Sequence, residues 1–332
     1  MKIVVDAMGG DYAPDIVIEG AFKAYQELGV EIILTGDENK IRSILKQYKN
    51  IRGISIHHTS ETIEMNESAA LSVRKKRDSS IVVGLQLVKA KYADAFVSAG
   101  NTGAVVCAAT LTLGLLEGVE RPGIAIIVPT LKEPTFVLDV GANIDPKPLH
   151  LLQYAIMSNV YMRDVFERKN PSIGLLNIGE EEAKGTDFMK ETHQLLGQAK
   201  INFIGNVEGK DIFTGKVDAI ICDGFVGNVA LKVMEGVAEM MGKLLRRELM
   251  RDLRGRIGIF LVRHALGRFK KHIDYAEYGG APLLGVNGTV IIGHGRSNVK
   301  AIKNAIRAAK IECERKVNEK IVEEIKSQGA IK

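Results

Sequence analysis

The chain has 332 residues, of which 46% are hydrophobic and 26% are charged, as expected for an ordinary globular protein with a large core. Its three cysteines are far apart and form no C-x-x-C pair, which excludes a disulfide framework and a cysteine-based zinc site. The formal charge of +5 is uneven, because residues 243–271 hold ten Lys or Arg against two acidic residues, a net +8 that leaves −3 elsewhere.

The start of the chain predicts a cytoplasmic protein with reduced thiols. A strand-like segment at residues 2–5 begins the sequence directly, without the basic and apolar regions of an export signal. The apolar runs at 123–128 and 283–286 are far shorter than the roughly 20 residues that a membrane-spanning helix requires. We therefore expect no membrane span.

Short segments rich in Val and Ile alternate with longer helical segments, which is typical of a mostly parallel sheet covered by helices. Strands are expected at 2–6, 31–35, 53–57, 94–98, 123–128, 135–139, 173–176, 201–204, 218–222 and 289–292. Helices are expected at 15–28, 38–48, 80–91, 102–115, 147–168, 186–197, 226–252 and 297–326. The connection at 129–134 is too short for a crossover, so it predicts an antiparallel hairpin and hence a mixed sheet.

No linker or repeat divides the chain. We expect one α/β catalytic domain covering residues 1–332, in which any two lobes are intertwined. A basic amphipathic helical protrusion is expected at about 237–275, with Gly255, Gly258 and Gly267 marking helix breaks.

Eight glycine-bearing turns follow the predicted strands and indicate a cleft that binds an anion. They are DAMGGD, SAGNTG, DVGAN, NIGEEEAKG, GNVEG, DGFVGN, GGAPLLGVNG and GHGRSN. Glycine lets backbone N–H groups approach a ligand closely, and a helix that begins next adds open donors. Polar residues fall at six strand ends and are predicted to converge on one sheet edge as a single site: Asp6, Ser98, Asp139, Asn177, Asn206 and Asp223.

The SAGNTG turn is the strongest single candidate for a phosphate or an oxyanion. Asn101 or Thr102 can cap the following helix, while Gly100 and Gly103 leave its amides open. No G-x-G-x-x-G opens a helix after the first strand, and GNVEGK lacks the Walker spacing, so neither NAD nor ATP is indicated. No nucleophile elbow is present either, so the attacking group is expected to come from a substrate.

Other polar residues have structural alternatives that the sequence leaves open. Lys184 follows three acids and is either a cleft cation for a phosphate or carbonyl, or part of a solvated turn. Asp223 is either a ligand or a helix cap, and His294 is either a base or a turn residue. No metal-ligand cluster is visible, so we predict no metal and no cofactor.

The basic segment combines an apolar stripe with cations, which suits an anionic lipid surface. A helical hairpin that packs on a second subunit, with its basic edge toward an acidic partner, is an equally good and compatible interpretation. Nucleic-acid binding is not expected, because few aromatic side chains are available for base stacking.

The whole chain resembles the bacterial phosphate acyltransferases of phospholipid synthesis. The resemblance runs from VVDAMGGD, with Pro14 after it, through SAGNTGA, DVGAN, NIGEEEAKG, GNVEG and DGFVGNV to GGAPLLGVNG and GHGRS. It implies transfer of a long-chain acyl group from acyl carrier protein to inorganic phosphate, giving acyl phosphate. It also implies a three-layer α/β/α fold like that of the isocitrate and isopropylmalate dehydrogenases, a homodimer, and a cytoplasmic enzyme bound peripherally to the membrane or to a membrane acyltransferase.

On this resemblance, Lys184 and Asn228 are the expected catalytic residues. The expected residues for phosphate and thioester are Gly9, Gly10, Ser98, Asn101, Thr102, Gly103, Asp139, Asn143, Asp223, Gly224 and His294. The expected membrane or partner surface comprises Arg254, Ile257, Phe260, Leu261 and Arg263. Two rival functions are a short-chain acyl-CoA transacetylase and a non-enzymatic lipid-surface protein that senses an anion.

Overall fold

The computed structural model describes residues 1–251, 253–273 and 277–328, without the side chains of residues 253–254 and 270–273. The strands are β1 (Lys2–Asp6), β2 (Glu31–Gly36), β3 (Ile54–His58), β4 (Ala95–Ser98), β5 (Gly123–Val128), β6 (Thr135–Leu138), β7 (Ser172–Leu176), β8 (Asn202–Val207), β9 (Ala219–Ile221), β10 (Ala281–Leu284) and β11 (Thr289–Ile292). In the described part of the chain they form one eleven-stranded sheet in the order β3-β2-β1-β4-β11-β10-β5-β6-β9-β7-β8.

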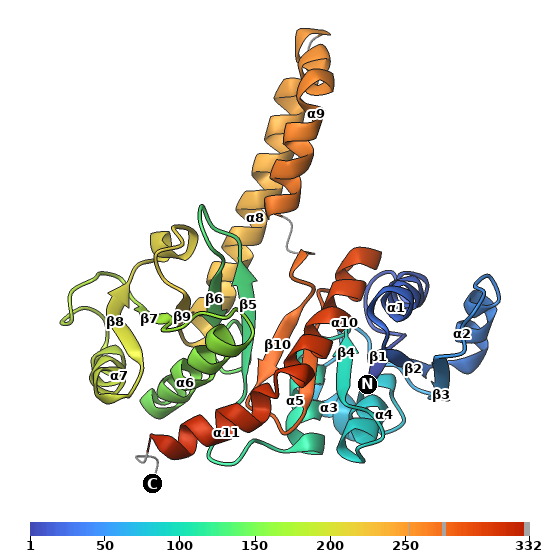
Figure 1. Ribbon diagram of the computed structural model, residues 1–332, viewed down its shortest axis with the longest axis horizontal. Helices are drawn as coiled ribbons and strands as arrows, with labels where there is room; N and C mark the ends of the chain where they lie inside the picture. Colours follow the sequence, from blue (N-terminus) through green and yellow to red (C-terminus); the bar gives the residue numbers. More distant parts are fainter. Residues whose placement is uncertain (252, 274–276, 329–332) are drawn as a thin grey trace.

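The helices that cover this sheet are α1 (Asp15–Leu28), α2 (Glu38–Leu45), α3 (Ala69–Lys75), α4 (Ser80–Lys89), α5 (Thr102–Leu113), α6 (Pro148–Asp164), α7 (Asp187–Gln198), the 3₁₀ helix η1 (Gly209–Phe213), α8 (Gly224–Leu249), α9 (Leu253–Ile273), α10 (Val299–Glu314) and α11 (Val317–Ser327). Helices α3, α4, α5 and the base of α8 pack on one face. Helices α1 and α10, and farther along the sheet α6 and α11, pack on the other face. The predicted three-layer, mixed and mostly parallel fold is therefore confirmed (Figure 1).

Strand direction changes midway along the sheet. Strands β1, β2, β3, β4 and β11 are parallel to one another, and so are β6, β7, β8 and β9. Between the two sets, β10 pairs antiparallel with both β11 and β5, and β5 pairs antiparallel with β6 as the predicted hairpin. Three successive reversals leave the β6–β9 set running opposite to the β1–β4 and β11 set. We call the parts built on these two sets the first lobe and the second lobe.

Helices α8 and α9 extend away from the sheet as a pair (Figure 1). The expected helix breaks in this segment are wrong, because α9 continues through Gly255, Gly258 and Gly267. A glycine costs a helix about 1 kcal/mol, and the surrounding Leu, Arg and Lys residues favour the helix enough to offset it. Among the described residues, no helix is both long and apolar enough to cross a bilayer.

Candidate active site

The carboxyl ends of β1, β4 and β11 bring three glycine-bearing loops of the first lobe into contact. The amide of Gly293 donates to the carbonyl of Ser98 at 2.7 Å, and the amide of Asp11 donates to the carbonyl of Gly295 at 2.8 Å. Gly10 has a φ of 110°, and a Cβ there would meet the Gly295 carbonyl oxygen at 3.1 Å. These loops therefore pack backbone against backbone, which the glycines at these positions allow.

Two buried side chains at this edge hold the loops from beneath. Asp6 and Ser98 are each 1% exposed, and the Ser98 hydroxyl donates to Asp6 Oδ2 at 2.7 Å. The amide of Gly100 donates to Ser98 Oγ at 3.0 Å. Burial raises the pKa of the Asp6 carboxyl, and hydrogen bonds from two serines and two backbone amides oppose that shift. Ser98 is therefore a buried support of the loop rather than an exposed substrate contact.

Asn101 caps α5, as the sequence predicted. Its Oδ1 accepts from the Ala104 amide at 3.0 Å, and its Nδ2 donates to three carbonyls of residues 64–67. The next two residues, Thr102 and Gly103, are exposed. Their amides make no hydrogen bond to any residue the structure describes, because they belong to the open first turn of the helix. The turn thus presents two free donors under a neutral cap.

The turn after β11 adds two basic residues and faces α8. His294 accepts from the Arg296 amide through Nδ1 at 3.1 Å, and its Nε2 lies 3.6 Å from Glu235 Oε1 on α8. The pKa of Glu239 is lowered mainly by Lys243, and Arg296 contributes to the same shift. Arg296 is exposed and has no ion pair with described residues. Its role was not predicted, although it lies within the GHGRSN motif.

The second lobe gathers another polar group, at the carboxyl ends of β6 and β9. Asp139 is fully buried, and its two carboxylate oxygens accept from the amides of Ile124, Gly141, Ala142 and Asn143 at 2.8–3.1 Å. Burial raises the pKa of Asp139, whereas these four amides oppose the shift. Asp139 therefore shapes the DVGAN loop and leaves few of its amides for a ligand.

The start of α8 lies against this loop. Asp223 caps α8 by accepting from the Val226 amide at 2.8 Å, and the Gly224 amide donates to the Asn143 carbonyl at 2.8 Å. Asn228 is exposed on the first turns of α8, and a Cβ at Gly141 would meet its Nδ2 at 2.5 Å. Asp223 is thus a helix cap, the structural alternative that the sequence left open.

Lys184 lies in the loop after β7, the strand that neighbours β9 in the sheet. It is exposed, and its ammonium makes no ion pair with described residues. Its carbonyl accepts from Asn177 Nδ2 at 3.1 Å, and Asn206 Nδ2 donates to the Glu181 carbonyl of the same loop at 2.9 Å. Lys184 therefore belongs with Asp139, Asp223 and Asn228, on the second lobe.

The prediction that all six polar strand ends converge on one edge is wrong. Because the two sets of strands run in opposite directions, Asp6 and Ser98 lie at one edge of the sheet, and Asp139, Asp223 and Asn177 lie at the other. Strands β4 and β7 are also six positions apart in the strand order, or roughly 29 Å at ~4.8 Å per strand. One phosphate cannot contact Asn101 and Lys184 of the same chain.

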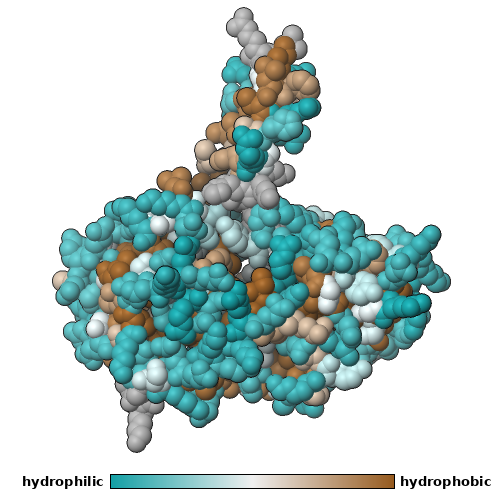
Figure 2. All heavy atoms as spheres, viewed as in Figure 1, coloured by the Kyte–Doolittle hydropathy of each residue, from teal (hydrophilic) through white to brown (hydrophobic). Residues whose placement is uncertain are grey.

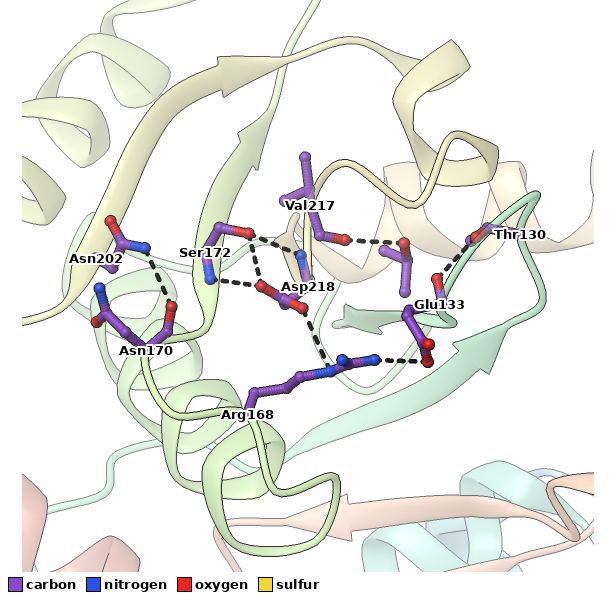
Figure 3. Close-up of polar contacts among 9 residues, drawn as sticks. Thr130, Glu133, Arg168, Asn170, Ser172, Asn202, Val217 and Asp218 are labelled. Atoms are coloured by element: carbon purple, nitrogen blue, oxygen red, sulfur yellow. Dashed lines mark hydrogen bonds and ion pairs between the residues drawn. The ribbon is translucent and has the colours of Figure 1, made fainter.

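The amino ends of the second-lobe strands have a structural network of their own (Figure 3). The amide and hydroxyl of Ser172, the first residue of β7, both donate to Asp218 Oδ2 at 2.8 Å, and Asp218 precedes β9. Arg168 joins Asp218, at 3.6 Å, to Glu133 of the β5–β6 turn, at 2.7 Å. These side chains pair among themselves, which leaves the carboxyl edges as the candidate sites.

The first-lobe edge suits an anion better than the second-lobe edge. Its α5 turn has a neutral cap and two free amides, and the exposed Arg296 lies in the turn after β11, which contacts the end of β4 before α5. At the second-lobe edge, two carboxylates already occupy the loop amides and the first turn of α8. We therefore take the turns at Gly9–Gly10, Asn101–Gly103 and His294–Arg296 as the candidate active site.

The predicted membrane or partner surface lies on α9. Ile257, Phe260 and Leu261 are exposed, with Leu261 at 73%, and the Arg263 guanidinium lies 4.8 Å from the Phe260 ring centre. Figure 2 shows apolar residues along this projecting pair beside polar ones. The side chain of Arg254 falls outside the described side chains.

Comparisons with known proteins find similarity along the whole chain. A profile described as "Fatty acid synthesis protein" matches residues 1–320. A phosphate acyltransferase of Geobacter sulfurreducens is 50% identical over 330 residues, which cover 99% of this chain and 95% of the relative. A phosphate acyltransferase of Dictyoglomus turgidum is 51% identical over 326 residues, covering 97% of each chain.

Solved structures share the fold at much lower identity. A phosphotransacetylase from Streptococcus pyogenes superposes with a TM-score of 0.64 at 18% identity, covering 94% of both chains. A 4-hydroxythreonine-4-phosphate dehydrogenase from Klebsiella pneumoniae gives a TM-score of 0.51 at 12% identity, covering 94% of this chain and 98% of the other. These likenesses concern the architecture alone.

Proposed function

The chain belongs to the phosphate acyltransferase family of fatty acid synthesis, and we propose that it transfers a long-chain acyl group from acyl carrier protein to inorganic phosphate. The product is an acyl phosphate for phospholipid synthesis. The observation that carries the proposal is the first-lobe edge, where the loop that leads into the neutrally capped turn of α5, the glycine turn after β1 and the glycine turn that carries Arg296 meet.

Little protein chemistry is required for this reaction. A phosphate oxygen attacks the thioester carbonyl carbon, a C–O bond forms, and the C–S bond breaks, so that the carrier's thiolate leaves with the electron pair. A substantial fraction of inorganic phosphate is already the dianion at neutral pH, and a thiol with a pKa near 8.5 is a good leaving group. Positioning of the reactants and stabilisation of the developing oxyanion are then sufficient. This agrees with a site made mainly of backbone amides.

Phosphate is assigned to the open amides of Thr102 and Gly103, with Arg296 as its counter-cation. Backbone donors at a helix N-terminus favour an anion, and a guanidinium can bind two phosphate oxygens at once. His294 is placed in the same turn and contributes a ring nitrogen beside Glu235. Catalytic roles for Lys184 and Asn228 stay predictions, since both lie at the other edge of the sheet.

The α8–α9 pair is proposed to serve assembly and membrane contact. The apolar side chains of α8 would pack on a second copy of the chain, and the tip of α9 would contact an anionic membrane. The exposed apolar residues and neighbouring arginines of α9 support the second role, because apolar insertion and charge attraction act together at a bilayer. The acidic carrier protein is a further proposed partner.

Phosphorus NMR tests the reaction and the donor together. Purified protein is incubated with inorganic phosphate and palmitoyl acyl carrier protein, and palmitoyl-CoA replaces the carrier thioester in a parallel tube. We expect a new acyl phosphate resonance only in the tube that contains palmitoyl acyl carrier protein. Signal in both tubes would keep acyl transfer to phosphate but remove the selectivity for the carrier protein. Silence in both, from folded protein and intact substrates, would overturn acyl transfer.

A further inference from the structure

Asp6 and Ser98 form a buried chain of hydrogen bonds beneath the candidate site. The Ser98 hydroxyl donates to Asp6 Oδ2 at 2.7 Å and, through the same oxygen, accepts from the Gly100 amide at 3.0 Å. The other carboxylate oxygen of Asp6 accepts from the Met8 amide at 3.1 Å. One carboxylate therefore fixes both the loop after β1 and the loop after β4.

These two loops also touch each other, which transmits the constraint to α5. A Cβ at Gly9 would lie 2.5 Å from Asp6 Oδ2 and 2.6 Å from the Gly100 nitrogen, so the loops approach as closely as backbone allows. Asn101, which caps α5, follows Gly100 directly. The position of the first amides of α5 therefore depends on where Ser98 holds Gly100.

Neither side chain can act on the substrate directly. Both are 1% exposed, and their oxygens already take part in hydrogen bonds within the loops. A carboxylate so close to an anion site would repel the anion if its charge were not engaged by these donors. Asp6 can therefore contribute to function only by holding the backbone of the loops in position.

We propose that Asp6 and Ser98 are positioning residues of the phosphate site, which they set through the Gly100 amide. The inference rests on the proposed binding of phosphate at α5. Loss of either side chain would let the 98–103 loop relax, so that the Thr102 and Gly103 amides no longer point together at the ligand. Phosphate binding should weaken, whereas binding of the thioester should be unchanged.

The test compares Asp6→Asn, Ser98→Ala and Ser98→Cys with Thr135→Val in the full-length protein. Asparagine keeps the shape of Asp6 but offers only one acceptor oxygen, and cysteine fills the place of Ser98 but donates weakly. Thr135 is a matched control, because it is a buried hydroxyl at the start of β6, away from Asp6, that donates to the Val217 carbonyl at 2.9 Å. Each variant's melting temperature shows whether it folds.

Steady-state kinetics should show a KM for phosphate raised about tenfold or more by changes at Asp6 or Ser98, with the KM for the thioester unchanged. The Asp6→Asn, Ser98→Ala double variant should be no worse than the more severe single variant, because both act through one chain of bonds. Thr135→Val should leave both KM values unchanged. An equal rise in Thr135→Val, or parallel rises in both KM values, would mean general destabilisation and would overturn the inference.

The variant Arg296→Ala tests the proposed location of phosphate separately from the positioning roles of Asp6 and Ser98. If that substitution raises the KM for phosphate while Asp6→Asn and Ser98→Cys do not, the positioning roles alone are wrong. If Arg296→Ala has no effect on the KM for phosphate, the proposed location of phosphate is wrong. Folded variants are required in each comparison, and Ser98→Cys provides one that preserves the packing.

Discussion

Arg296 follows a glycine turn that contacts both other loops of the candidate site. The turn is locked by the Asp11 amide on the Gly295 carbonyl and by the Ser297 amide, which donates to the His294 carbonyl at 2.9 Å. The backbone of the turn is thus fixed, and the exposed guanidinium of Arg296 makes no ion pair with the residues that the structure describes. A cation that pairs with no acid in the absence of substrate is available to an anion.

We predict that Arg296→Ala raises the KM for phosphate at least tenfold, because a charge-assisted pair to phosphate contributes about 1.5–3 kcal/mol. Arg296→Lys should recover part of this loss, since lysine keeps the charge but not the two-pronged geometry. Initial rates at varied phosphate measure the effect. Lys184→Ala provides the comparison at the opposite edge of the sheet. A rise in the KM for phosphate in that variant alone would place the phosphate site at that edge.

Glu312 on α10 gives a second prediction at this scale. Its carboxyl is 1% exposed, and burial raises its pKa from 4.5 to about 8, with Thr289 opposing the shift only in part. The folded protein therefore holds the proton more tightly than the unfolded chain does. The resulting stability is complete below about pH 4.5 and is lost as the pH rises through 8, a change of up to about 5 kcal/mol.

Glu312→Gln should remove this dependence, because an amide does not titrate. Relative to wild type, the variant should gain stability as the pH rises from 5.5 to 8.5. Urea unfolding at pH 5.5, 7.0 and 8.5 measures the difference in the free energy of unfolding. A difference that is the same at all three pH values would show that Glu312 has an ordinary pKa.

Most helices and strands were predictable, because hydrophobic periodicity and glycine turns mark them locally. The errors lie where a choice depends on neighbours. The helix expected at 297–326 is two helices, because Lys316 adopts a φ of 52° between α10 and α11. Strand β10 is only four residues long and was hidden inside a glycine-rich turn, and α3 was not expected at all.

The candidate site was predictable in its parts and not in its arrangement. Asn101 caps α5, and the turns around Gly10, Gly100 and His294 meet, as the motifs indicated. The separation of Lys184 follows from the β5–β6 hairpin, which was predicted, together with β10, which was not. Each reversal flips the edge at which later strands end, so one missing strand is enough to misplace half of a site.

At the scale of a single element, the tip of α9 carries the prediction of membrane contact. Ile257, Phe260 and Leu261 are exposed on a helix that extends well away from the sheet (Figure 1). Leu261→Glu places a charge among them and should weaken binding to vesicles that contain anionic lipid by tenfold or more. Vesicle flotation measures the bound fraction.

Leu131→Glu is the matched control for Leu261→Glu. Leu131 is 90% exposed in the β5–β6 turn, so the same substitution adds the same charge outside α9. Vesicle binding of this variant should equal that of the wild type. Equal losses in the two variants would show that added negative charge, rather than the α9 tip, governs the binding.

At the scale of the whole molecule, α8 connects the two sheet edges before it leaves the body. It begins at the second-lobe edge with its cap, Asp223, and reaches His294 at the first-lobe edge through Glu235. Twelve residues of helix span about 18 Å. From its first turn onward α8 carries a stripe of exposed apolar side chains at helical spacing: Val226, Val229, Val233, Val237, Met240, Met241 and Leu244.

Such a stripe on a projecting helix is unusual for a monomer and predicts that a second copy covers it. A hollow of about 430 Å³ beside Gly236, Met240 and Leu244 could receive side chains of a partner helix.

Met240→Glu should therefore convert a dimer to a monomer, because burying an unpaired carboxylate in an apolar interface costs several kcal/mol. Light scattering on a sizing column measures the molar mass at several protein concentrations. Leu261→Glu, at the tip, should stay dimeric while losing vesicle binding. A Met240→Glu protein that remains a dimer at all concentrations would place the interface elsewhere and leave the α8 stripe without its predicted partner.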